Sequence, residues 1–426
     1  MIGGGAAGLM AAASAAKSGR QVLLLEKNKK FGVKILMSGG TRCNITHNCD
    51  SREIVAAFGR QGKFLHSALA ALPPHEVVEL FESLGVATKT ESTGKIFPVS
   101  NRAIDVRDAL VRFATSQGCT LQNNSPVTGL ARTENGFVVS CGEQDYFADA
   151  VILTTGGLSF PGCGTTGDGY AWAESLGHSI VDTTPALTPL LSNCDWANEL
   201  KGLTLNPACV EVWPPSKGEQ GSNPTPNPKP KGKKKAKPLM SNTGSFLFTH
   251  FGFSGPAPMN VSGEIAKHPD KKKLQLKCDF FPDQSPQQMI DQLSRLKKEH
   301  GSRSVFRTVN ESWPEFPRRL VEQLIAQAGI DPSIRLAELS ADRLKLLVDQ
   351  MKSTTFPLQG TLGYEKAEVT SGGVDLSEVS SSTLESKLCP GLFFAGEILN
   401  LDGPIGGFNF QAAWSTGWLA GQSVMV

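Results

Sequence analysis

The sequence lacks any apolar run long enough to cross a membrane, and no signal-peptide pattern opens it. Its nine cysteines are scattered and include no Cys-x-x-Cys, which argues against a zinc or dithiol site and fits reduced, intracellular thiols. It also lacks the residue order of a Ser/His/Asp triad, metal-ligand spacing and a P-loop lysine. We therefore expect a soluble protein with no metal, cytoplasmic unless an N-terminal targeting segment has been removed.

Charge and length restrict the function less sharply. The chain has 426 residues, 40% hydrophobic and 19% charged, which suits a globular protein of two or more lobes. Its net charge of +2 argues neither for nor against nucleic-acid binding. Oligomeric state cannot be predicted from these totals.

A glycine pattern at the start of the chain carries the clearest functional signal. Gly3, Gly5 and Gly8 precede an Ala-rich helical run to Lys17, and an apolar strand then ends at Glu26. In such a motif the first glycine makes a tight turn, the second lets backbone approach a pyrophosphate, and the third packs helix against strand. The helix N-terminus offers N–H groups to phosphates, and the acid accepts hydrogen bonds from a ribose. The pattern predicts a dinucleotide site.

Only Met1 and Ile2 precede this motif, although a strand of about five or six residues normally does. We expect either that the first strand has been trimmed, which we favour, or that the sheet is built with a stub and binds its nucleotide more weakly.

Two later glycine-rich loops also suit a ligand. The first runs from Ser38 to Asn44, soon after the ribose-binding acid, and its glycines leave backbone exposed to a phosphate or planar ring. The second is Thr154–Gly157, which ends a strand and is followed by a further Gly-dense stretch. Ligands bind at the carboxyl ends of strands in open α/β sheets. Surface turns are the alternative for both loops.

The C-terminal segment resembles the remaining half of such a site. An apolar strand from Leu392 delivers Gly396 and Glu397, and a glycine-led helix begins near Gly407. Glu397 can accept hydrogen bonds from ribitol hydroxyls, and the helix N-terminus can stabilise an anionic reduced flavin. A purely structural helix is the alternative.

The middle of the chain has a different character. The sequence predicts a small meander from strands at 120–122, 127–131 and 136–141, with a further strand over 146–155. From about residue 185, further strand-like pieces are interrupted by a Pro/Lys tract over 214–238, and helices are expected at 287–298, 316–328 and 341–352. We interpret the tract as a flexible excursion; contact with nucleic acid or an anionic membrane is the alternative.

Four segments together resemble a known family. They are residues 3–8, 38–44, 249–256 and the stretch from Ala395 to Asn409. The combination is similar to FAD-dependent oxidoreductases described as aminoacetone-oxidase-like or bile-acid-pathway-reductase-like. The resemblance implies noncovalent FAD and an α/β fold of the glutathione-reductase type: a doubly wound sheet with a small β-meander, and an inserted β-barrel and helical lobe. We expect the FAD domain at 1–186 and 356–426, and the insert at 187–355.

The expected cofactor-binding residues come from all of these segments: Gly3, Gly5, Ala6, Gly8, Glu26, Lys27, Ser38, Gly39, Gly40, Arg42, Asn44, Val127, Thr155, Gly156, Gly157, Ala395, Gly396, Glu397, Gly407 and Asn409. No catalytic acid or base can be assigned, although His250 and Tyr170 are candidates.

The expected function is hydride or electron transfer through FAD, to or from a small organic substrate bound between the lobes. NADH or NADPH is a possible electron donor, but the absence of a second glycine fingerprint argues against a dedicated NAD domain. Two alternatives stay open: a flavoprotein that acts on RNA or another macromolecule, and a non-enzymatic flavin-binding redox sensor.

Overall fold

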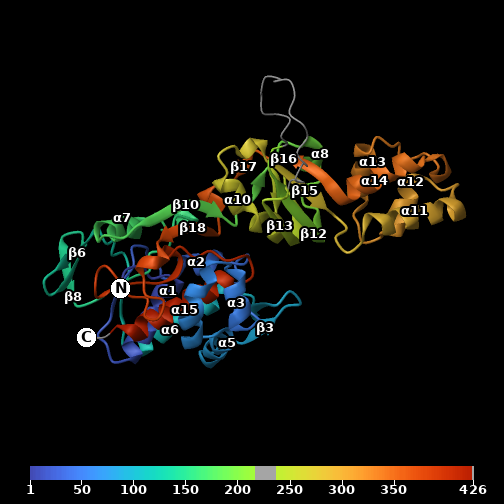
Figure 1. Cartoon of the computed structure of the whole chain (residues 1–426). Coiled ribbons are helices and arrows are strands. Elements are labelled where there is room, and N and C mark those ends of the chain that lie inside the picture. The colour runs from blue at the N-terminus through green and yellow to red at the C-terminus, as the bar shows by residue number, and fades with distance from the viewer. Residues whose placement is uncertain (216–236, 425–426) are drawn as a thin grey trace, which may run out of the picture. The chain divides into compact units, whose positions relative to one another are not determined.

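The structure is a computed structural model that describes residues 1–215 and 237–424. The chain divides into two compact units, Met1–Ala186 with Tyr364–Val426, and Leu187–Gly363 (Figure 1). The sequence predicts a return to the first unit at residue 356, and the structure places it at Tyr364. The reason is that β16 (Thr354–Pro357) and β17 (Gly360–Thr361) still belong to the sheet of the second unit.

Parallel strands form the centre of the first unit. β1 (Leu23–Leu25) pairs with β5 (Thr120–Gln122), and β9 (Val151–Leu153) pairs with β19 (Leu392–Phe394). Ile2 bridges Leu25 on one side and Leu153 on the other, both in parallel register. This short segment therefore occupies the central position between the two pairs.

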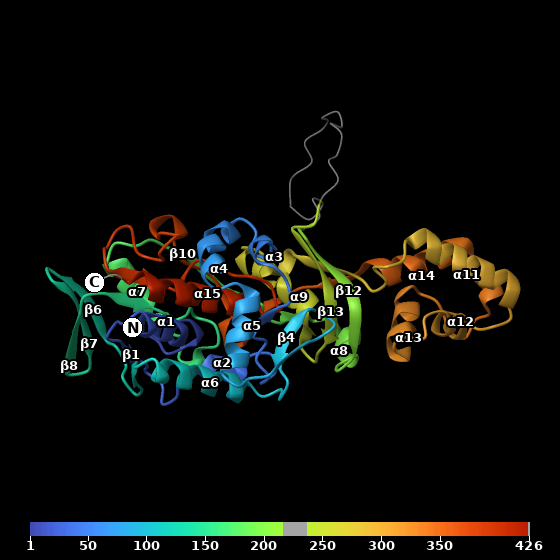
Figure 2. The same ribbon diagram turned by 90° about the horizontal axis from the view of Figure 1, so that it is seen from below.

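The two ends of the chain meet in one pair of helices, α1 (Ala6–Lys17) and α15 (Phe408–Ser423), which Figure 2 shows side by side. A Cβ added at Gly417 would lie 2.4 Å from the carbonyl oxygen of Ala7, so the backbones touch. The Ser14 hydroxyl also donates to the carbonyl oxygen of Trp418 at 2.8 Å. Small residues on both helices allow this close approach.

The meander differs from the prediction in its first strand. It consists of β6 (Gly129–Thr133), β7 (Gly136–Cys141) and β8 (Gln144–Ala148). The segment 120–122 instead pairs parallel with β1, because α6 (Ala103–Ser116) serves as the crossover that returns the chain to the main sheet. The expected strand over 146–155 is divided between β8 and β9.

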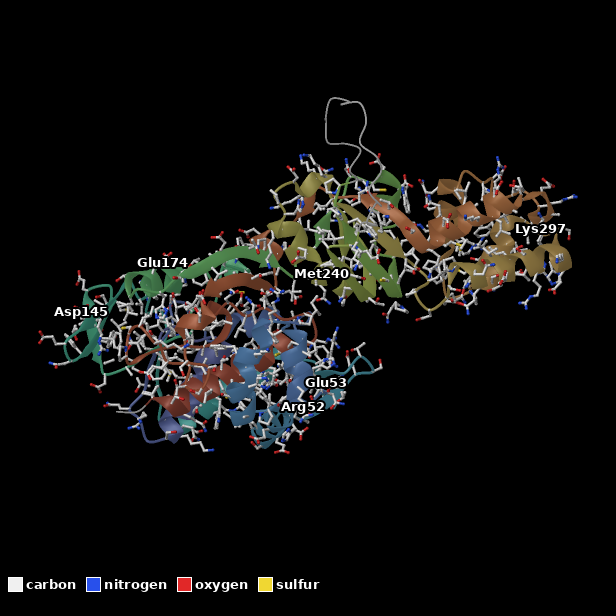
Figure 3. All side chains as sticks on the ribbon, in the orientation of Figure 1. Arg52, Glu53, Asp145, Glu174, Met240 and Lys297 are labelled. Carbon is white, nitrogen blue, oxygen red and sulfur yellow. The ribbon has the colours of Figure 1, made fainter. Side chains whose placement is uncertain are left out.

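Shorter elements surround this core. α3 (Ser51–Ala57) begins with a capping box: the Asp50 side chain accepts from the backbone N–H of Glu53, and the Glu53 side chain, labelled in Figure 3, accepts from the backbone N–H of Asp50. The remaining helices and strands of the first unit are α2 (Val33–Met37), α3 (Ser51–Ala57), α4 (His66–Ala71), α5 (Pro74–Ser83), α7 (Asp168–Ser175), β2 (Thr46–His47), β3 (Thr88–Thr90), β4 (Lys95–Pro98), β10 (Ile180–Ala186) and β18 (Val369–Val374).

The second unit contains an antiparallel sheet of seven strands in the order β16-β15-β12-β13-β14-β11-β17. Its other strands are β11 (Leu190–Leu191), β12 (Thr204–Trp213), β13 (Met240–Phe248), β14 (Gly252–Ser254) and β15 (Gln275–Asp279). The two edge strands, β16 and β17, follow each other with only two residues between them, so the sheet curls until its edges meet, like a barrel. Its core contains phenylalanines in mutual ring contact: Phe246, Phe248, Phe253, Phe280 and Phe356.

Helices complete the second unit: α8 (Asp195–Glu199), α9 (Pro256–Asn260), α10 (Ser262–Lys267), α11 (Pro286–His300), α12 (Val305–Ser312), α13 (Arg318–Gln327) and α14 (Ala341–Ser353). Of these, α11, α13 and α14 match the expected helices, whereas α8, α9, α10 and α12 were not predicted individually. Most of the Pro/Lys tract, residues 216–236, lies outside the described residues. None of the helices described here is long and apolar enough to span a bilayer.

Candidate dinucleotide-binding site

The three motif glycines meet different surroundings. A Cβ on Gly3 would lie 2.6 Å from the Thr154 carbonyl oxygen, and one on Gly8 would lie 1.9 Å from the Gly3 carbonyl oxygen. These two glycines are required by close packing. A Cβ on Gly5, in contrast, would meet no atom within 4 Å. The backbone of Gly5 therefore borders open space, as expected where a ligand must approach it.

The N-terminus of α1 opens at the same place. Gly5 is its N-cap residue, no side chain caps it, and its first turn contains no acidic residue. The first N–H groups of the helix are thus left without a side-chain acceptor, and the helix dipole adds partial positive charge there. An anionic group such as a pyrophosphate is the complementary ligand.

Glu26 is held rigidly at the carboxyl end of β1. One carboxylate oxygen accepts from the backbone N–H of Gly4 at 2.7 Å, and the other accepts from that of Asn28 at 2.8 Å. The side chain is buried, yet its remaining lone pairs can accept from hydroxyl groups. The ammonium group of the next residue, Lys27, pairs with Asp168 at 2.6 Å.

The loop from Ser38 to Asn44 has a strained backbone. Positive φ angles occur at Gly39, Gly40, Thr41 and Cys43, two of which are not glycine. Asn44 is buried, and its Oδ1 has no hydrogen-bond partner among the described residues, which leaves it available to a ligand. Such backbone strain is typical of loops that clamp a ligand.

Two side chains of this loop form contacts within the protein itself. The guanidinium of Arg42 lies 4.0 Å from the centre of the Phe97 ring and pairs with Glu91 at 2.7 Å. It therefore braces the β3–β4 hairpin. The hydroxyl of Ser38 donates to the carbonyl oxygen of Ile35, closing the end of α2.

The loop after β9 lies directly against the first motif. The Thr154 hydroxyl donates to the Gly3 carbonyl oxygen at 2.7 Å, and the Thr155 hydroxyl is buried with no partner among the described residues. Gly156 has a φ of 72°, and a Cβ on Gly157 would lie 2.4 Å from the Thr370 hydroxyl. The predicted loop Thr154–Gly157 therefore lies against the glycine motif of residues 3–8.

Glu397 is the centre of a hydrogen-bond network. Its carboxylate pairs with Lys34 Nζ at 2.5 Å and accepts from the Ser159 hydroxyl and from the backbone N–H of Thr370. Lys34 also donates to Ser159 at 2.6 Å. Three donors from α2, the loop after β9 and β18 therefore fix the carboxylate in one orientation.

The N-terminus of α15 resembles that of α1. Gly407 caps it with a φ of 94°, and a Cβ there would lie 2.6 Å from Thr46 backbone atoms. No side chain caps this helix, and no acid lies in its first turn. The Asn409 side chain accepts from the N–H of Gly403 and donates to its carbonyl oxygen, so it supports the preceding loop. Gly396 packs against Ala7, where a Cβ would lie 2.7 Å from the Ala7 side chain.

The two candidate acids or bases differ in setting. Tyr170 is buried in the first unit, with no hydrogen-bond partner for its hydroxyl among the described residues. Burial, together with the charge of Glu397 and the neighbouring Tyr364, raises the pKa of Tyr170 above its usual range, so the phenol keeps its proton. His250 belongs to the second unit, where its ring contacts Phe251. Val127 lies half-buried against the core of the first unit.

Sequence reasoning missed the residues that hold Glu397 in place. Lys34, Ser159 and Thr370 come from three separate segments, and no spacing in the sequence links them to residue 397. A lysine in an otherwise apolar stretch is the only signal that Lys34 gives. Within the described ranges, no cluster of three or more His, Cys, Asp or Glu side chains could hold a metal ion.

These features fit FAD. The open space at Gly5 and the uncapped α1 N-terminus suit a pyrophosphate, and Glu26 suits the adenosine ribose. The unpartnered polar atoms of Asn44 and Thr155 suit the polar groups of the cofactor. Fold and site together define a Rossmann-type dinucleotide-binding protein.

The chain belongs to the family described as HI0933-like protein Rossmann domain, which matches residues 1–423. It is an FAD-binding oxidoreductase of that family.

Three relatives are similar over almost their whole length. The chain is 32% identical to a ribosomal RNA dihydrouridine synthase of Escherichia coli (strain K12), covering 100% of this chain and 97% of that protein. It is 31% identical to a 3-dehydro-bile acid delta(4,6)-reductase of Clostridium scindens, covering 99% and 98%. It is also 31% identical to a ribosomal RNA dihydrouridine synthase of Haemophilus influenzae, covering 100% and 97%.

Proposed function

We propose that this protein is an FAD-dependent reductase that adds hydride to a carbon–carbon double bond conjugated with a carbonyl group, and that its substrate is uridine in RNA. The observation that carries this proposal is the similarity over the full chain to two ribosomal RNA dihydrouridine synthases. The bile-acid reductase supports the same reaction class, since its name describes reduction of double bonds in a 3-oxo compound.

The proposed reduction adds one hydride and one proton to the substrate. Hydride adds to the β carbon of the conjugated double bond and a proton adds to the α carbon. NADPH or NADH would supply the hydride equivalent, and a protein acid or water the proton. FAD, when bound, supplies the hydride-transfer chemistry.

The residues of the chain bind and orient the cofactor. Gly5 and the N-terminus of α1 would hold the pyrophosphate, Glu26 the ribose, and the fixed carboxylate of Glu397 the ribitol hydroxyls. The N-terminus of α15 would place partial positive charge beside the ring. Tyr170 is protonated at neutral pH like any tyrosine, and its raised pKa extends the protonated state to more alkaline pH.

The test uses purified protein with FAD, NADPH or NADH, and a ribosomal RNA transcript. We expect dihydrouridine in the digested RNA by mass spectrometry, with loss of the product when FAD is omitted. A protein that oxidises NADPH or NADH but forms no dihydrouridine in any ribosomal RNA would contradict the proposed substrate.

A small conjugated enone is the second candidate, and the bile-acid reductase favours it. Deletion of residues 214–238, which contain the lysine tract, separates the two candidates. Turnover of a 3-oxo-4-ene steroid should survive that deletion, whereas reduction of RNA should weaken.

A further inference from the structure

Positive charge is concentrated in the second unit. Within residues 187–363, the part that the structure describes contains 18 Lys and Arg against 16 Asp and Glu, whereas the first unit contains 18 against 23. The net charge of +2 for the whole chain conceals this difference. A polyanionic partner would therefore be attracted to the inserted unit.

The strand register brings several lysines to one end of the sheet. β12 ends at Trp213, which pairs with Gln275 of β15, and the neighbouring Val212 pairs with both Leu276 and Met240. The chain thus leaves the sheet after Trp213 and returns at Met240 beside the start of β15. Lys237 lies just before this return, and Lys273 lies just before the start of β15.

Around the start of β15 the described part of the chain carries six lysines, on α10, on the short 3-10 helix η3 (Lys271–Lys273), on β15 and just before β13, and we call this set the basic surface: Lys237, Lys267, Lys271, Lys272, Lys273 and Lys277. The first five are exposed. Among the described residues, Lys237, Lys267, Lys271 and Lys272 form no ion pair with a carboxylate.

Acidic groups near the basic surface compensate little of its charge. Asp270 pairs with Lys273 at 2.9 Å, and both are exposed, so the pair contributes little and is screened by salt. Lys277 Nζ lies 4.2 Å from the centre of the Trp213 ring, and Glu211 accepts from the indole N–H of Trp213 at 2.8 Å. Glu264 lies on the neighbouring α10. Six lysines therefore face three carboxylates.

We propose that this basic surface binds the phosphates of the RNA substrate and positions the RNA on the second unit. The inference rests on the proposed function, since it takes RNA as the substrate. Exposed lysines without carboxylate partners are the groups that bind phosphate by counterion release. Trp213 is half-buried beside them, and the part of its ring that Lys277 leaves uncovered can contact a base. An interfacial membrane anchor would instead need a helix with a broad apolar face, and η3 (Lys271–Lys273) contains only lysines.

The test removes three of these charges and keeps the fold. The variant combines Lys267→Gln, Lys271→Gln and Lys272→Gln; the matched control combines Arg295→Gln, Lys298→Gln and Lys345→Gln, which are also exposed but lie on α11 and α14. Figure 3 shows Met240, where the tract returns to the sheet, well separated from Lys297 on α11. The dissociation constant for a ribosomal RNA transcript is measured at several salt concentrations with holoprotein.

For each lysine that contacts a phosphate, we expect the slope of log K against log salt to decrease in magnitude by about 0.7 to 0.9. The triple variant should therefore lose about two units of slope and about tenfold or more in affinity, while the control stays close to the parent protein. The flavin absorbance and the rate of flavin reduction by NADPH or NADH should not change in either variant.

Three outcomes would overturn the proposal: a parent protein that binds no RNA, an equal loss in the control, or an unchanged slope. Binding to phosphatidylserine vesicles that the triple variant loses, without RNA binding, would assign the surface to membranes instead. The two proposals can fail separately. If the parent forms dihydrouridine and the triple variant still binds RNA like the parent, the proposed role of the basic surface is wrong and the proposed reaction stands. If the triple variant loses RNA binding but the parent forms no dihydrouridine, the proposed reaction is wrong and the role of the surface stands.

Discussion

Lys34 Nζ lies 2.5 Å from Glu397 Oε2 and joins two segments that are 363 residues apart in the chain. Ser159 bonds to both partners, so three segments are fixed around one carboxylate. Because the side chains are about one-fifth to one-quarter exposed, the ion pair is only partly screened by solvent. Its main effect is to orient Glu397 before the cofactor arrives.

Replacing Lys34 with Met should weaken FAD binding. The carboxylate of Glu397 would lose its cationic partner and part of its fixed orientation, which we expect to cost about 1 kcal/mol, or about fivefold in the FAD dissociation constant. Titration of the apoprotein followed by flavin fluorescence measures this. Lys34→Arg keeps the charge and should lie close to the parent; equal affinity in all three proteins would show that Lys34 has no positioning role.

Gly5→Ala and Gly8→Ala should fail in different ways. A methyl group on Gly5 meets no protein atom, so the protein should fold normally, but the methyl group would enter the space assigned to the pyrophosphate. On Gly8 it would lie 1.9 Å from the Gly3 carbonyl oxygen, so the fold itself should lose about 1 to 3 kcal/mol.

Thermal unfolding of the apoproteins and flavin absorbance after reconstitution separate the two effects. If Gly5→Ala bound FAD with the affinity of the parent protein, the pyrophosphate would not bind at Gly5.

Contact between α1 and α15 should be sensitive to a single methyl group. A Cβ on Gly421 would lie 2.4 Å from the Ala11 carbonyl oxygen and 2.8 Å from the side chain of Ser14. Gly421→Ala should therefore lower the free energy of unfolding by about 1 to 3 kcal/mol. Gly162→Ala is the control, because a Cβ there meets no atom within 4 Å. Urea denaturation should show a shifted midpoint for the first variant alone.

His178 should make stability depend on pH. It is buried, its Nε2 lies 2.7 Å from the Ser386 hydroxyl, and its Nδ1 lies 3.3 Å from Glu378. Burial lowers its pKa below the ordinary 6.5, although Glu378 opposes this shift. The contribution of the neutral His178 imidazole to the free energy of unfolding is therefore fully present above about pH 6.5. It is lost as the pH falls from there toward the lowered pKa of His178 in the folded protein, by up to about 1.4 kcal/mol per pH unit.

His178→Gln should remove this part of the pH dependence. The free energy of unfolding, measured in urea at several pH values, is the readout. A parent protein whose stability rises on acidification through this range would contradict the lowered pKa.

The sequence predicts the local arrangement of residues 3–26 well because its signals are local. The glycine spacing at 3–8 and the acid at the end of β1 require only neighbouring residues, and the structure brings them together. The sequence indicates the meander less well, since Thr120–Gln122 has the same strand propensity whether it pairs with β1 or with β6.

Contacts between residues far apart in the sequence could not be predicted from such local signals. The loop sequence does not indicate that Phe97 and Glu91 hold the guanidinium of Arg42; that Arg42 lies beside the cofactor stays a prediction. Likewise, the basic surface depends on the pairing of β12 with β15, a register that composition does not reveal.

The close packing of α1 against α15 also has a consequence for synthesis. On the ribosome, α1 emerges long before the helix that covers its small-residue face, with the whole inserted unit made in between. The dinucleotide-binding site is therefore completed only after α15 has been synthesised, and we expect FAD to bind after that point.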